Sequence, residues 1–106
     1  MHILCVCQGG NTRSVAMACR LKEKYHLKDV IAIGTRRVSP ETFEMMGNWA
    51  DKIFVVGNEK IVREVPQKFR SKITLFDIGR DIWHNPMNKE LQEIIRKELE
   101  KIRFIS

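Results

Sequence analysis

The sequence predicts an α/β fold in which a four-stranded parallel sheet, in the expected order 2-1-3-4, is covered by helices on both faces. Short apolar runs alternate along the chain with segments whose apolar residues recur at helical spacing. This alternation is typical of a parallel sheet, and right-handed crossovers restrict its strand order to a few possibilities. The 106 residues have room for one core and contain no linker or repeat, so we expect a single domain spanning residues 1–106.

The first half of the chain supplies two strands and two helices. Residues 2–7 form an apolar run expected to be a strand, and residues 13–26 carry apolar side chains along one side of a helix. A second, short strand is expected at residues 30–33. Ser39 provides a capping side chain directly before Pro40, and this pair predicts the start of the second helix.

The second half repeats the alternation twice. Residues 52–56 form another apolar run and predict the third strand. Asn58 can cap a helix that Pro66 disturbs or ends, because proline lacks a backbone N–H. The fourth strand is expected at residues 73–76, and after a loop Asn88 can cap a last helix with one apolar face.

The charge and the cysteines narrow the function classes. A formal net charge of +6 suits an anionic partner such as a phosphate ester and argues only weakly for nucleic acid, which we do not expect as a ligand. The three cysteines and three histidines show no metal-ligand spacing, so we expect no metal and no cofactor. No apolar run is long enough for a membrane span or a secretory signal, which favours a cytoplasmic protein and no membrane partner.

The loop after the first strand carries the most informative motif, a cysteine and an arginine separated by five residues. Gly9 and Gly10 let backbone amides point inward, as a nest for a tetrahedral oxyanion requires. Arg13 offers a planar fork for two of its oxygens, and Ser14 can donate a hydrogen bond to the Cys7 sulfur. These groups favour the thiolate, which is the nucleophilic form of cysteine. We predict that the loop binds phosphate or sulfate through Gln8, Gly9, Gly10, Asn11, Thr12, Arg13 and Ser14.

A structural explanation exists for each part of this motif. Gly-Gly turns are common after strands, buried cysteines are usually small hydrophobic side chains, and arginines are often merely solvated. The combination, placed between a strand and an amphipathic helix whose N-terminus Asn11 or Thr12 can cap, favours the phosphate loop.

A second group is needed if a phosphoryl ester is to be cleaved at Cys7, because the departing oxygen requires a proton. Asp77 and Asp81 follow the fourth strand, at the same edge of the sheet as the Cys7 loop. An acid in this loop can reach the cysteine, while an aspartate directly after a strand often serves only to turn the chain.

These motifs together resemble the low-molecular-weight protein tyrosine phosphatases, and most closely a compact group of predicted tyrosine phosphatases with that fold. The similarity lies in the loop from Cys7 to Ser14, in Trp49-Ala50-Asp51, in Phe76-Asp77-Ile78 and in Asp81-Ile82-Trp83. It implies a phosphatase acting on a phosphorylated protein or a small aryl phosphate.

The resemblance also implies a role for each matching residue. Cys7 is the expected nucleophile, Arg13 the phosphate clamp and Ser14 the donor to sulfur. Asp81 is the expected general acid and then base, in preference to Asp77, and Trp83 is expected to wall the substrate cleft. Trp83 has an alternative reading as a core side chain beneath a long loop.

Other functions remain open at this point. A phosphotransferase-system IIB-like phosphocarrier has a similar size and fold, but it needs neither Arg13 nor Asp81. An arsenate reductase of the same fold needs a late pair of cysteines, and none follows Cys19. A non-catalytic phosphate-binding module would keep the loop without a placed acid.

Cys5 is expected to lean toward the same face as Cys7, either as an inert buried thiol or as a disulfide partner.

Overall fold

The structure is a computed structural model, and it describes residues 1–79 and 82–102. Its described elements, in chain order, are β1 Ile3–Cys7, α1 Arg13–Lys24, β2 Val30–Gly34, α2 Pro40–Trp49, β3 Lys52–Gly57, α3 Glu59–Glu64, the 3-10 helix η1 Gln67–Lys72, β4 Ile73–Asp77 and α4 Lys89–Ile102. The strands form one parallel sheet in the order β2-β1-β3-β4, which confirms the predicted fold class and strand order.

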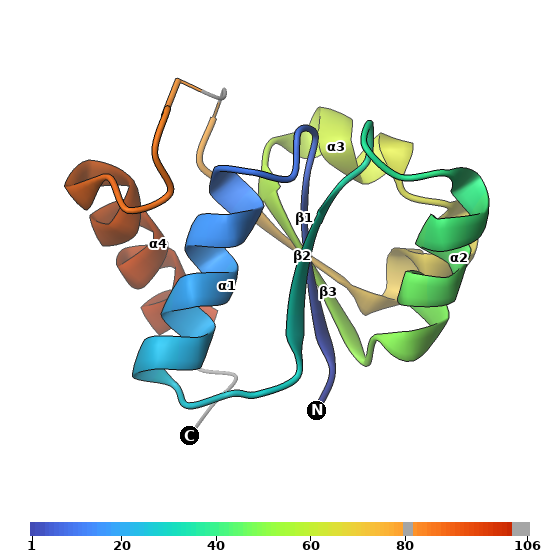
Figure 1. The fold of residues 1–106 in the computed structure, drawn as a ribbon, viewed down its shortest axis with the longest axis horizontal. Helices are drawn as coiled ribbons and strands as arrows, with labels where there is room; N and C mark the ends of the chain where they lie inside the picture. Colours follow the sequence, from blue (N-terminus) through green and yellow to red (C-terminus); the bar gives the residue numbers. More distant parts are fainter. Residues whose placement is uncertain (80–81, 103–106) are drawn as a thin grey trace.

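The helices lie in two layers, one on each face of the sheet. Figure 1 shows α1 and α4 on one side and α2 and α3 on the other. Because successive side chains of a strand point to opposite faces, Ile3 of β1 packs in the cluster formed with α1 and α4. Leu4 packs in the cluster formed with α2, α3 and η1. The residues of both clusters are buried, so the central strands are packed on both faces below the loops at their carboxyl ends.

Three of the expected helix caps are present as side-chain hydrogen bonds. Ser39 Oγ accepts from the Thr42 N–H at 3.1 Å, and Asn58 Oδ1 accepts from the Lys60 N–H at 3.0 Å. Asn88 Oδ1 accepts at 2.9 Å from the N–H of Glu90, in the first turn of α4. These bonds satisfy amides that a helix N-terminus leaves unpaired.

The structure differs from the sequence prediction in two helical details. Thr12 occupies the cap position of α1, but neither it nor Asn11 caps the helix through a side-chain hydrogen bond. The expected end of α3 near Pro66 is confirmed, since α3 stops at Glu64, but the 3-10 helix η1 that follows directly after the proline was not predicted. A proline cannot donate to the preceding turn but is well suited to open a new one.

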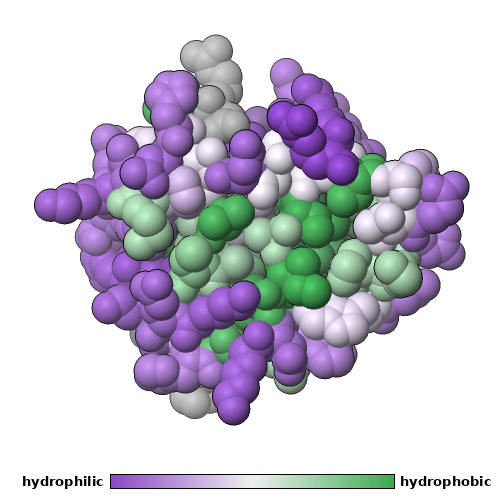
Figure 2. Space-filling model, in the orientation of Figure 1, coloured by the Kyte–Doolittle hydropathy of each residue, from purple (hydrophilic) through white to green (hydrophobic). Residues whose placement is uncertain are grey.

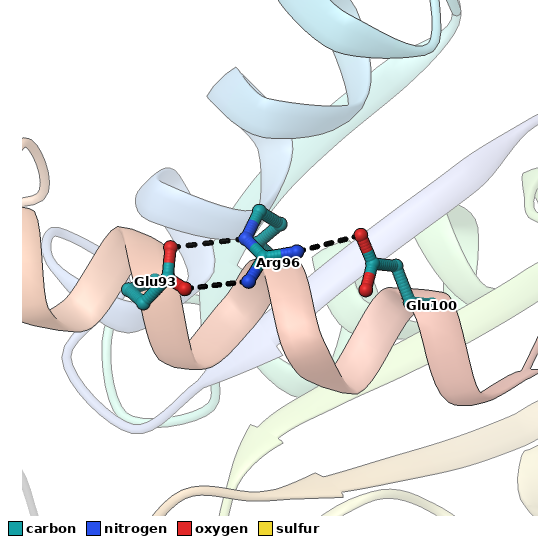
Figure 3. A network of polar contacts seen from close by, with 3 residues as sticks. All are labelled: Glu93, Arg96 and Glu100. Atoms are coloured by element: carbon teal, nitrogen blue, oxygen red, sulfur yellow. Dashed lines mark hydrogen bonds and ion pairs between the residues drawn. The ribbon is translucent and has the colours of Figure 1, made fainter.

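The surface differs between the open sheet edge and α4. Figure 2 shows apolar residues gathered over β2, whose Ile31 is 37% exposed. On the exposed face of α4, Arg96 donates to Glu93 at 2.9 Å and to Glu100 at 2.7 Å (Figure 3).

None of the described helices combines the length and the apolar character that crossing a membrane requires.

Candidate active site

Cys7 ends β1 and presents its sulfur to the first residues of the following loop. The side chain is 2% exposed. The Gly10 N–H donates to Cys7 Sγ at 3.1 Å, and Ser14 Oγ lies 3.2 Å from the same sulfur. Both groups lie within hydrogen-bond distance of the sulfur. The structure therefore brings Cys7 together with two of its expected loop partners.

Arg13, the first residue of α1, is buried, and its guanidinium has one bonded nitrogen and one nitrogen without a partner among the described residues. It is 1% exposed, and Nη1 donates to the Gly79 carbonyl at 2.9 Å. Its Nε has no hydrogen-bond partner among the described residues. Burying a cation without acceptors costs several kcal/mol, so buried charges are normally paired. The guanidinium is therefore placed to receive an anion.

A glycine on β3 makes room for this guanidinium. Gly57 has a φ of +148°, and a Cβ atom there would lie 2.5 Å from Arg13 Nη1. The Gly57 carbonyl also accepts from the N–H of Ile78 at 2.8 Å and of Gly79 at 2.9 Å. These bonds turn the chain after β4 across the end of β3, so the Gly79 carbonyl reaches Arg13.

Two further glycines bring the phosphate loop against β2. Gly10 has a φ of +74°, and a Cβ atom there would lie 2.5 Å from the Gly34 nitrogen. A Cβ atom at Gly34 would lie 2.5 Å from the Gln8 carbonyl oxygen. Only glycines permit this approach, and the positive φ of Gly10 is a backbone conformation that glycine adopts without strain. The role of Gly34 was missed, because it depends on a contact between distant segments.

The other residues expected in the loop lie in different environments. Gln8 donates through Nε2 to Glu64 Oε2 at 2.9 Å, and Gly9 is partly buried. Asn11 is exposed, whereas Thr12 is buried and its carbonyl accepts from the N–H one turn into α1. Their contact with phosphate stays a prediction.

The structure describes Trp83 and Asp77 but not the predicted acid, Asp81. Asp81 lies outside the described residues, so its role stays a prediction, while Asp77 is the exposed last residue of β4. Trp83 is 9% exposed and packs in the cluster beneath α1 and α4, as its alternative reading as a core side chain expected. Its Nε1 is buried without a hydrogen-bond partner in the described part of the chain, and its place in a substrate cleft stays a prediction.

Cys5 is chemically distinct from Cys7. The expectation that the two side chains lean toward the same face is wrong: Cys5 packs in the cluster with α1 and α4, and Cys7 in the other. Burial raises the pKa of the Cys5 thiol, so this sulfur stays protonated. Across residues 1–79 and 82–102, no three or more histidine, cysteine or acidic side chains come together as a metal site.

Comparisons with known proteins agree on the architecture. No protein-family model matches the sequence, and neither does the sequence of any curated protein. The structure is similar to SP-PTP, a low-molecular-weight protein tyrosine phosphatase from Streptococcus pyogenes, with a TM-score of 0.72, 19% identity and coverage of 100% of this chain and 95% of that chain. The chain has the fold of the low-molecular-weight protein tyrosine phosphatases.

Two other structures with this fold give the same result. A low-molecular-weight protein tyrosine phosphatase from Bacillus subtilis has a TM-score of 0.62 and 19% identity, and the match covers 97% of this chain and 99% of that chain. Another protein tyrosine phosphatase has a TM-score of 0.68 and 16% identity, with coverage of 99% and 97%. At such low identity the likeness concerns the low-molecular-weight phosphatase fold alone.

Proposed function

We propose that the protein hydrolyses phosphomonoesters through a phosphocysteine intermediate on Cys7. The observation that carries this proposal is the buried Arg13 guanidinium, whose Nε lacks a partner, at the end of a loop that donates to the Cys7 sulfur. A cation with unused donors beside a thiol of this kind suits a phosphoryl group, because arginine binds two phosphate oxygens at once. The fold supports the same reaction class.

In the first step the Cys7 thiolate attacks phosphorus. The S–P bond forms while the P–O ester bond breaks, and the departing oxygen takes a proton from Asp81. Arg13 and the inward amides stabilise the charge on the non-bridging oxygens. The product of this step is a phosphocysteine and a free alcohol or phenol.

In the second step water attacks the phosphocysteine. Asp81, now a carboxylate, takes a proton from the water as the O–P bond forms and the S–P bond breaks. Sulfur leaves as a thiolate, which the Gly10 N–H and the Ser14 hydroxyl stabilise at the distances already present. Inorganic phosphate is released, and the nucleophile is regenerated without any cofactor.

We infer that the substrate is an aryl phosphate such as a phosphorylated tyrosine on a protein. The similar structures are named as protein tyrosine phosphatases. The net charge of +6 favours the approach of an anionic substrate.

Hydrolysis of an aryl phosphate by the wild type and three variants tests this function. Cys7→Ser removes the nucleophile and Arg13→Lys removes the two-oxygen grip, so both are expected to lose nearly all activity. Cys19→Ser is the matched control, because Cys19 lies on α1 and is only partly buried, and it is expected to retain activity. Full activity in Cys7→Ser would disprove the phosphocysteine route.

A further inference from the structure

Glu64, the last residue of α3, lies against the rim of the phosphate loop. Its Oε2 accepts a hydrogen bond from Gln8 Nε2 at 2.9 Å, and its Oε1 accepts one from Thr35 Oγ1. Arg36 Nη2 lies 3.7 Å from Oε2. One carboxylate therefore joins three segments that are distant in the sequence: the phosphate loop, the end of β2 and the end of α3.

The same loop is also joined to the end of β2 through the main chain. The Thr35 N–H donates to the Cys7 carbonyl at 2.8 Å, and the Arg36 N–H donates to the Gln8 carbonyl at 3.1 Å. These bonds continue the pairing of β1 with β2 beyond its last register pair, Cys7 with Gly34. The backbone carbonyls of Cys7 and Gln8 are thus hydrogen-bonded to Thr35 and Arg36. Glu64 additionally joins the side chains of Gln8 and Thr35.

The hydrogen bonds and the charge around Glu64 keep its carboxyl group ionised. Partial burial alone would raise the pKa of its carboxyl group, but the hydrogen bonds from Thr35 and Gln8 and the charge of Arg36 outweigh burial, so the pKa is lowered. The side chain is 28% exposed. Glu64 is therefore a carboxylate at neutral pH, with each of its two oxygens accepting a hydrogen bond.

A negative charge at the rim of an anion site is unfavourable by itself, because it repels the ligand. The geometry points to a compensating benefit: we infer that Glu64 is a positioning residue, which ties the Gln8 side chain to α3 and keeps the loop amides preorganised for the phosphoryl group. This inference rests on the proposed function. Preorganised donors bind an oxyanion more tightly because they need not be ordered at the moment of binding.

The two effects of Glu64 have opposite signs, which makes them separable. Glu64→Gln removes the negative charge and one of the two acceptors while keeping the shape. If Glu64 acted only through its charge, inorganic phosphate would bind more tightly to the variant. If it positions the loop, we expect phosphate to bind about 10-fold more weakly, as the loss of one charge-assisted hydrogen bond suggests.

Calorimetric titration with inorganic phosphate measures this difference directly. Glu59→Gln is the matched control, because Glu59 begins the same helix, is exposed and carries the same charge. We expect its phosphate affinity to equal or slightly exceed that of the wild type. Unchanged or tighter phosphate binding by Glu64→Gln would overturn the positioning role.

A second variant separates local positioning from general stability. Thr35→Val removes the other hydrogen bond to Glu64 and is expected to weaken phosphate binding by a smaller factor. The two changes should be non-additive, since they act on one network. We expect KM for an aryl phosphate to rise in parallel with the phosphate dissociation constant, and strictly additive effects would contradict the inference.

Phosphate binding also distinguishes a failure of this inference from a failure of the proposed reaction. Wild-type protein that binds phosphate without hydrolysing an aryl phosphate would disprove the reaction and leave the titration of Glu64→Gln valid. Wild-type protein that binds no phosphate would overturn both proposals.

Discussion

Replacing Gly34 with alanine places a Cβ atom against the backbone of the phosphate loop. Because the clashing atoms are backbone atoms, no change of side-chain conformation relieves the contact. A Cβ atom at this position would lie 2.5 Å from the Gln8 carbonyl oxygen, from the Gly10 nitrogen and from the Gly9 carbonyl carbon. All three atoms belong to the backbone of the loop. Ordinary van der Waals contact begins near 3.4 Å, so the loop must move by about 0.9 Å away from β2.

The size of this displacement sets the expected loss. Misplacing groups around a reacting atom by about 1 Å costs about 100-fold in rate, which corresponds to about 2.7 kcal/mol of transition-state stabilisation. We expect kcat/KM for an aryl phosphate to fall by about this factor in Gly34→Ala. Overpacking should also lower the free energy of unfolding by about 1–3 kcal/mol. Steady-state kinetics and urea unfolding measure the two quantities separately.

Gly47→Ala provides the control for the stability effect. A Cβ atom at Gly47 would lie 2.5 Å from the ring of Phe69, in the cluster beneath α2 and η1. We expect a similar loss of stability but no change in kcat/KM per folded molecule. Full activity in Gly34→Ala, or an equal loss of activity in both variants, would refute the reasoning.

Two further predictions concern acidic side chains. Asp81→Asn should lower kcat about 10²–10⁴-fold for a poor leaving group, and less for a good one, whereas Asp77→Asn should have little effect; the reverse pattern in the kinetics would assign the acid to Asp77. Because the folded state lowers the pKa of Glu64, this carboxylate contributes fully to the free energy of unfolding above its ordinary pKa of 4.5. The contribution is lost as the pH falls through the lower pKa of the folded state. The unfolding free energies of wild type and Glu64→Gln, measured in urea, should therefore converge as the pH falls below 4.5, and a constant difference down to pH values near 2 would contradict this.

The positions of the strands were predictable because they depend on patterns that are local in the sequence, whereas the right-handed crossover rule alone left a few strand orders open. Alternating apolar runs and helical periodicity placed every strand within one or two residues of its observed bounds, and the capping side chains of Ser39, Asn58 and Asn88 marked three helix starts. The close spacing of Cys7 and Arg13 likewise let one short loop reveal the candidate chemistry.

The remaining features depend on contacts between distant segments, so no local pattern reveals them. In the sequence, Glu64 is one of several charged residues on a short helix, and only the position of α3 beside the phosphate loop shows its contacts. Gly34 reads as the end of a strand until the loop packs against it. Cys5 and Cys7 both lie on β1 but pack in different clusters, which the alternation of side chains along a strand does not reveal.

The hydrogen bond from Arg13 to Gly79 links the first turn of α1 to the segment that follows β4. Nη1 is engaged by the Gly79 carbonyl at 2.9 Å, while the buried Nε has no hydrogen-bond partner among the described residues. Gly79 also stands two residues before Asp81 in the chain. The residue proposed to hold the phosphoryl group is therefore hydrogen-bonded to the segment that leads, along the chain, to the residue proposed to supply the proton.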